Sequence, residues 1–185
     1  MDSMREKLSA ERLRELTGLI HSPYFSASKI VWMLENVEDL REAVGRGEVV
    51  FGTMDSWLVW NLTGGAGVGA VVTDVTNASR YMLMNISTLQ WDEQMLSTFN
   101  IPVSSLPRIV PSFGEVYGHT ISNGPLQGRI PVCGILGDQQ AALFGQACFT
   151  AGMGKSTYGT GCFLLVNTGD KLSYSSRGLL TTVAY

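Results

Sequence analysis

The stretch GILGDQQAALFGQACFTAGMGKSTYGTGCF, residues 134–163, contains the strongest local signals in this sequence. It continues the apolar run 130–136, which predicts a buried strand. Gly137 permits a sharp turn, Asp138 stands where a helix would begin, and Gly145 can end that helix. The first half of the stretch therefore predicts a strand, a turn and a short helix, with a carboxylate at the turn.

The second half predicts two strands joined by the turn Gly159-Thr160-Gly161, with the later strand running from Cys162 to Val166. Each motif also has an ordinary structural interpretation. An aspartate at a helix start is most often a cap, and Gly-Thr-Gly is more often a hairpin turn than a phosphate loop. The functional alternative places the Asp138 carboxylate and the Thr160 hydroxyl opposite each other across a cleft.

Motifs along most of the chain, taken in order, resemble the FGGY family of carbohydrate kinases, and within it the branch that phosphorylates glycerol. The resemblance extends from about Thr17 to Tyr185. It implies an α/β, actin-like (ribonuclease H-like) kinase fold. The motifs that carry it are PYFSASK at 23–29, FGTMDSWLVWNLTGG at 51–65, TDVTNASRYMLMN at 73–85, GDQQAALFG at 137–145 and KSTYGTGCFLLVNTG at 155–169.

The resemblance, and nothing in the spacing itself, implies the site residues. Asp138 aligns with the catalytic base of the family, which takes the proton of the attacking hydroxyl. The implied substrate-binding residues are Tyr24, Asp138, Gln139 and Phe163, and the implied nucleotide-binding residues are Thr160 and Gly161. No metal-ligand set is indicated by the sequence.

The implied reaction is transfer of the γ-phosphoryl group of ATP to a terminal hydroxyl of glycerol. ATP and Mg²⁺ are the implied cofactors, glycerol and ATP the implied small-molecule partners, and the cytoplasm the expected location. Homo-oligomerisation of the complete enzyme stays open. Two alternatives also stay open: a kinase for another small polyol, and a catalytically inactive kinase relative that binds protein.

The resemblance divides the chain into three parts. Residues 1–16 form a charged, poorly matched helix with Ser9 as its cap; residues 17–146 match the later part of the first family domain, and residues 147–185 the first strands of the second. The family's N-terminal phosphate hairpin and several ligands of glycerol and adenosine have no counterpart here. We therefore expect part of an enzyme, which as an isolated chain is inactive and poorly soluble.

Composition limits the other possibilities. Hydrophobic residues make up 45% of the 185 residues and charged residues 16%, which is typical of a globular core rather than disorder. The net charge of −3 provides no basic surface for nucleic acid. No apolar run approaches the roughly 20 residues needed to cross a bilayer. The three cysteines, Cys133, Cys148 and Cys162, lie in apolar runs and are expected to be buried free thiols.

Periodicity predicts the remaining elements. Ser26 is expected to cap a helix whose stripe Ile30, Met33, Leu34 and Val37 faces the core, and a solvated helix is expected over 35–46. Strands are expected over 48–51, 71–75, 115–121 and 178–185, and a helix over 91–99. A helix from Thr53 to Leu62 presents an apolar face, expected to be core, that contains Met54, Trp57, Leu58 and Leu62.

Overall fold

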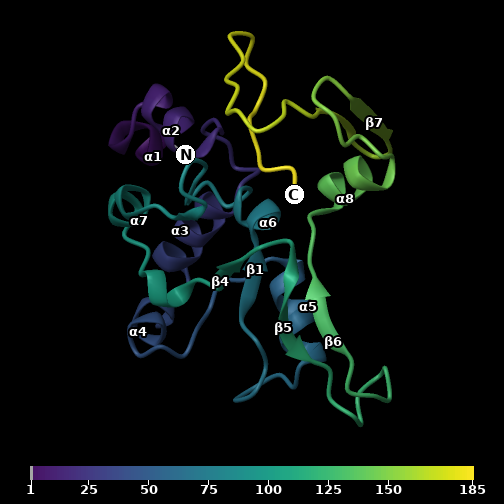
Figure 1. Cartoon of the computed structure of the whole chain (residues 1–185). Coiled ribbons are helices and arrows are strands. Elements are labelled where there is room, and N and C mark those ends of the chain that lie inside the picture. Colours follow the sequence, from purple (N-terminus) through teal and green to yellow (C-terminus); the bar gives the residue numbers. More distant parts are fainter. Residues whose placement is uncertain (1) are drawn as a thin grey trace.

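The computed structural model describes residues 2–185, in which helices alternate with short strands (Figure 1). The helices are α1 (Asp2–Lys7), α2 (Ala10–Thr17), α3 (Ser26–Asn36), α4 (Leu40–Gly45), α5 (Met54–Leu62), α6 (Val75–Ala78), α7 (Glu93–Phe99) and α8 (Asp138–Gly145). The strands are β1 (Val72–Asp74), β2 (Met84–Asn85), β3 (Gln90–Trp91), β4 (Arg108–Val110), β5 (Phe113–His119), β6 (Pro131–Gly134), β7 (Gly154–Tyr158) and β8 (Cys162–Val166). The α/β class predicted from the sequence is confirmed.

The strands pair two by two. β1 and β4 run parallel, whereas β2–β3, β5–β6 and β7–β8 are antiparallel. Parallel strands need a long crossover connection, and here α6, β2, β3 and α7 all lie between β1 and β4 in the chain. This crossover folds back to form the larger apolar core.

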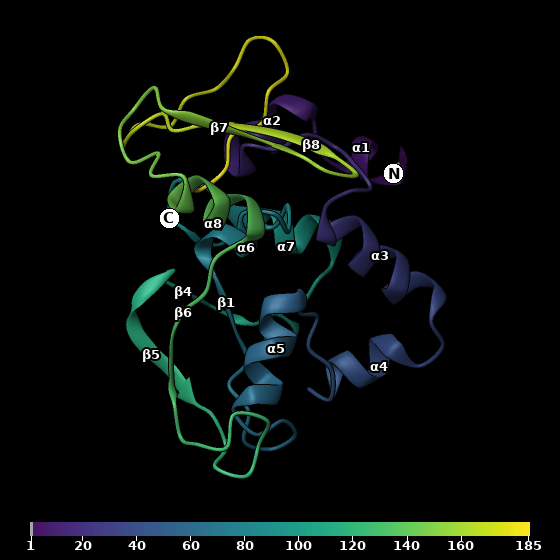
Figure 2. The same ribbon diagram turned by 90° about the vertical axis from the view of Figure 1, so that its right-hand side faces the viewer.

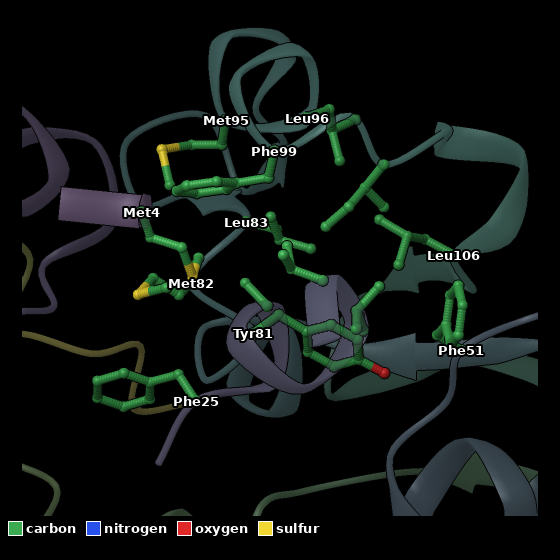
Figure 3. Packing of buried hydrophobic residues seen from close by; sticks show 14 of the residues in the cluster. Met4, Phe25, Phe51, Tyr81, Met82, Leu83, Met95, Leu96, Phe99 and Leu106 are labelled. Atoms are coloured by element: carbon green, nitrogen blue, oxygen red, sulfur yellow. The ribbon is translucent and has the colours of Figure 1, made fainter. Parts of the chain in front are cut away.

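The larger core packs α2, α3 and α7 around the segment that follows α6. Figure 3 shows Tyr81 and Leu83 within this cluster, with Met95 and Phe99 of α7 near them. Tyr81, Leu83 and Met95 are almost completely buried. Burial of each such side chain contributes about 1.5–3 kcal/mol, so this cluster fixes the end of α6 relative to α2 and α3.

A second, smaller core joins α5 to the strands. It consists of Val59, Val72, Val110, Tyr117 and Ile135, which come from α5, β1, β4, β5 and the residue after β6. One side chain from each of these elements meets the others. The end of β6, which leads into α8, is therefore anchored to the β1–β4 pair.

The C-terminal segment, drawn in yellow in Figure 1, leaves the β7–β8 hairpin and returns along α2 and α6. The Tyr174 hydroxyl donates to the Glu15 carbonyl (3.0 Å), and the Thr181 amide donates to the Gly18 carbonyl (2.9 Å). Gly18 has a φ of 74°, which favours glycine. The strand expected over 178–185 is absent, because these residues bond to loops and helices rather than to a neighbouring strand.

The apolar face predicted for α5 is not core. Met54 is 70% and Trp57 56% exposed, Leu58 is exposed, and Leu62 is half-buried. The buried residues of α5 are Ser56 and Val59. Periodicity identified the apolar side of the helix, but the elements that pack on α5 cover a different side.

Other predictions fail locally. No strand forms over 48–51; instead the Phe51 amide donates to the Ser105 carbonyl (2.8 Å) and the side chain is buried. Ser26 is the first residue of α3 rather than its cap, since Phe25 occupies that position. Within the predicted stripe of α3, Val37 is exposed. By contrast, the Ser9 hydroxyl caps α2 by accepting from the Arg12 amide (3.2 Å), as predicted.

The strand expected over 130–136 forms as β6, but most of its residues are exposed and only the following Ile135 is buried. The cysteines differ likewise: Cys148 is buried, whereas Cys133 and Cys162 are exposed, and all three are free thiols. The helix expected over 35–46 is confined to α4, which begins at Leu40. In each case packing partners, rather than local apolar character, decide the exposure.

Candidate functional site

Helix α8 begins at the junction of three elements. Gly137 occupies its N-cap position, and the Gly137 amide donates to the Thr76 hydroxyl of α6 (2.7 Å). Asp138 is the first helical residue and is exposed. The Asp138 carboxylate therefore does not cap α8, and it lies at the surface where β6 ends.

A second carboxylate, Asp74, behaves in the opposite way. Asp74 is fully buried and caps α6, accepting from the amides of Thr76 and Asn77 (both 3.0 Å). It also accepts from the hydroxyls of Thr76 and Ser112 (both 2.7 Å). Because it is buried and accepts from these four protein groups, Asp74 is a structural anchor that holds Thr76 against the start of α8.

The Asp138 carboxylate is held by the next residue in the chain. Its Oδ1 accepts from the Gln139 amide (2.8 Å) and its Oδ2 from Gln139 Nε2 (3.0 Å). The Gln139 Oε1 in turn accepts from Lys155 Nζ of β7, and Lys155 Nζ also donates to the Thr157 hydroxyl (2.8 Å). A continuous hydrogen-bonded chain thus runs from α8 to the hairpin.

The β7–β8 hairpin presents one face to α8, and both strands contact that helix (Figure 2). Side chains alternate along a strand, so Lys155 and Thr157 share this face with their cross-strand partners Leu165 and Phe163. All four are buried or half-buried, whereas residues of the opposite face such as Leu164 are exposed. The pairing therefore brings Phe163 to the same surface as Gln139.

The turn Gly159-Thr160-Gly161 closes the hairpin, as predicted, with the Gly159 amide donating to the Gly161 carbonyl (2.9 Å). Thr160 is exposed at the tip. A Cβ atom at Gly161 would lie 2.8 Å from the Phe163 ring. Gly161, which is expected at the nucleotide phosphates, thus lies directly beside Phe163, which is expected at the substrate.

Tyr24 is related to the site by an electrostatic interaction with Arg80. The Tyr24 side chain is 63% exposed, and its ring contacts Phe25 edge-on (5.4 Å between centroids). Arg80 Cζ lies 5.0 Å from the Phe25 ring centroid. Burial lowers the pKa of Arg80, while electrostatic interactions with Tyr24 and Asp138 act in the opposite direction. Arg80 is therefore a half-buried cation that interacts electrostatically with both of these predicted site residues.

The structure thus places Gln139 beside Asp138 and Phe163 on the hairpin face that lies against α8, while the 159–161 turn lies at the hairpin tip and Tyr24 shares with Asp138 an electrostatic interaction with Arg80. Sequence reasoning gave no role to Arg80 or Lys155. Both lie within quoted motifs, TDVTNASRYMLMN and KSTYGTGCFLLVNTG. A cation inside an apolar or strand-like run was the signal that could have identified them.

Within residues 2–185, no group of three or more His, Cys, Asp and Glu side chains is arranged to hold a metal ion. None of the helices in this part of the chain has the length and apolar character required for a bilayer crossing.

The sequence resembles those of known proteins over its whole length. The profile of the FGGY family of carbohydrate kinases, N-terminal domain, matches residues 1–145. A glycerol kinase of Beijerinckia indica is 56% identical over 190 residues, which include 100% of this chain and 38% of that protein. A glycerol kinase of Bacillus cereus is 52% identical over 184 residues, covering 100% of this chain and 36% of the relative.

Among solved structures, Plasmodium falciparum glycerol kinase with ADP superposes with a TM-score of 0.91 at 43% identity, over 100% of this chain and 36% of that one. A xylulose kinase from Brucella ovis, 21% identical, superposes with a TM-score of 0.71 over 88% of this chain and 32% of that one, and shows the fold alone. The chain spans little more than a third of the length of these relatives.

Proposed function

Because the chain belongs to the FGGY family of carbohydrate kinases, we propose that the protein containing it transfers the γ-phosphoryl group of ATP to a terminal hydroxyl of glycerol. The observation that carries this proposal is the pair of exposed Asp138 and half-buried Gln139 at the start of α8, joined by hydrogen bonds to the β7–β8 hairpin. The name shared by the relatives in Beijerinckia, Bacillus and Plasmodium supports glycerol as the substrate.

In this proposal Asp138 orients the attacking hydroxyl and accepts its proton. Phosphoryl transfer proceeds through a loose transition state, so positioning and charge neutralisation contribute more than early deprotonation. Gln139 occupies one lone-pair direction of each Asp138 oxygen. The remaining directions of this exposed carboxylate can accept from a substrate hydroxyl. Gln139 and Tyr24 supply further hydrogen bonds to glycerol, and Phe163 covers its carbon backbone.

The nucleotide phosphates would contact the 159–161 turn, where Thr160 offers a hydroxyl and the backbone offers amides. Arg80 would add a positive charge beside Asp138, where negative charge gathers on the transferring phosphoryl group. Mg²⁺ would bind together with the ATP phosphates, where it would neutralise their charge, and we assign it no ligand among the described residues.

We further propose how the chain is divided between the two domains of the enzyme. Residues 17–146 belong to the first kinase domain and residues 147–185 to the beginning of the second, so that the site forms where α8 meets the hairpin. We place the complete enzyme in the cytoplasm. Its catalysis requires phosphate contacts beyond the 159–161 turn, and the isolated chain is therefore inactive.

The test is a chimera in which this chain replaces the matching segment of the Beijerinckia relative. We expect ATP- and glycerol-dependent ADP release from the chimera. Asp138→Asn should lower kcat by at least ~10²-fold without changing the melting temperature, because the amide keeps the shape but cannot accept the proton.

Asp170→Asn is the matched control, since Asp170 is an exposed aspartate in the segment after β8. It should leave turnover unchanged. An Asp138→Asn chimera that retained more than about a tenth of kcat would remove Asp138 as the base. A folded chimera that phosphorylated a different polyol, or none, would favour one of the two alternative functions.

A further inference from the structure

Lys155 is a buried cation without an acidic partner. Its side chain is 3% exposed, on the face of β7 that lies against α8. The ion pairs among the described residues join Arg12 to Glu15 and Arg46 to Glu42 and Glu48, and no described carboxylate pairs with Lys155. Burying an unpaired charge is costly, and lysines are rarely buried unless paired. The packing of the hairpin alone gives no reason for an ammonium here.

The polar contacts of Lys155 lead toward Asp138. Nζ donates to Gln139 Oε1 and to the Thr157 hydroxyl. An ammonium group has three donors and no acceptor, so it selects the oxygen end of the Gln139 amide. The nitrogen end is thereby directed to Asp138 Oδ2, at 3.0 Å.

The orientation of this amide matters for the carboxylate. If the Gln139 amide were rotated by half a turn, its oxygen would face the Asp138 carboxylate and two acceptors would oppose each other. Without Lys155, the oxygen end of the amide loses the donor that anchors it, so the Gln139 side chain can move and Asp138 can lose the donor that holds it. Lys155 thus helps to fix the position of the Gln139 amide, and through this amide the position of the Asp138 carboxylate.

We propose that Lys155 is a positioning residue of the kinase site, fixing the Gln139 amide so that Gln139 and Asp138 are held for the polyol hydroxyls. This assignment rests on the proposed function. Lys155 contacts neither the substrate nor the reacting atoms in this scheme. As an unpaired buried charge Lys155 destabilises the fold, but it arranges Gln139 and Asp138 for substrate binding.

The experiment compares Lys155→Met, Gln139→Ala and the double variant in the Beijerinckia chimera. We expect Lys155→Met to raise the KM for glycerol about tenfold, the range expected when a hydrogen bond to a charged group is lost. The double variant should be no worse than Gln139→Ala, because Lys155 acts through Gln139. Lys171→Met, which removes an exposed lysine, is the matched control.

Two readouts separate positioning from a structural role. The KM for ATP should stay unchanged, whereas a loosened hairpin would raise it as well, since Thr160 lies at the hairpin tip. The melting temperature of Lys155→Met should stay equal or rise, because methionine removes a buried charge. Lys155→Gln, which retains a donor, serves if the methionine variant does not fold.

Three results would overturn the assignment: unchanged glycerol KM in Lys155→Met, a double variant whose losses multiply, or parallel increases in both KM values with a lower melting temperature. If the chimera itself is inactive, the proposed function fails. The positioning role of Lys155 is then tested by glycerol titration and by crystal structures of the wild-type and Lys155→Met chimeras. Those structures should show Lys155 Nζ bonded to Gln139 Oε1 and the Gln139 amide reoriented in Lys155→Met. A wild-type structure without this bond refutes the proposal.

Discussion

At the scale of single residues, the same side chain serves structure or chemistry according to what surrounds it. Asp74 accepts only from protein donors and is buried, whereas Asp138 receives hydrogen bonds from one neighbour and remains exposed. The family resemblance implied the Asp138–Gln139 pair, but the roles of Lys155 and Arg80 depend on contacts between distant elements.

Tyr81 gives a pH-dependent prediction at this scale. Its buried hydroxyl accepts from the Thr53 amide (2.9 Å) at the start of α5. Burial raises the pKa of Tyr81 above its ordinary value of about 10. The raised value means that the neutral phenol favours the folded state. This contribution is complete below about pH 10 and is lost as the pH rises through the folded pKa.

Tyr81→Phe should therefore flatten the alkaline decline in the free energy of unfolding. At neutral pH it should cost about 1–3 kcal/mol, because the Thr53 amide loses its acceptor. Urea unfolding at pH 8, 10 and 11 measures both effects. Tyr158→Phe, at an exposed position, is the control. Identical pH profiles for Tyr81→Phe and wild type would contradict the role of the buried phenol.

At the scale of elements, local signals predicted the hairpin and α8 but not the side of α5 that is buried. Glycines at 159 and 161 between two apolar runs determine a turn without help from the rest of the chain. The exposure of Trp57, in contrast, depends on which elements pack on α5. The strand expected over 48–51 fails for the same reason: Phe51 bonds to the Ser105 loop, and no strand lies beside it.

Gly161→Ala tests the coupling within the hairpin. The φ of Gly161 lies outside the left-handed range, so alanine fits the backbone, but its Cβ would lie 2.8 Å from the Phe163 ring. The ring must move, at a cost of about 1–3 kcal/mol. We expect the glycerol KM of the chimera to rise. Gly145→Ala, where no atom lies within 4 Å, should change nothing. Equal kinetics for both variants would show that Phe163 does not line the site.

At the scale of the whole molecule, the chain exposes apolar surface and strand edges together. Met54, Trp57 and Leu58 lie at i, i+3 and i+4 on α5, and they form one exposed stripe. Each sheet in the described residues has two strands, so each leaves unpaired backbone groups at its edges. Both features favour association between copies.

Light scattering of the 185-residue chain should therefore show self-association that increases with concentration. Trp57→Lys, placed in the middle of the stripe, should shift the association to concentrations several-fold higher. Val68→Lys adds the same charge at an exposed loop residue outside the stripe and should have little effect. A chain that is monomeric at all concentrations, with or without the substitutions, would contradict this prediction.

The returning C-terminal segment has a kinetic consequence. Tyr174 and Glu15, which it joins, are 159 residues apart, and Ser79 and Thr182 are 103 apart. Closing a loop of 159 residues costs about 3 kcal/mol more entropy than closing the β7–β8 turn, and these contacts cannot form until residues 174–182 have left the ribosome. The hairpin and the helices can form early, but the surface between α2, α6 and α8 is covered only when residues 174–182 are synthesised, and the nascent protein exposes it until then.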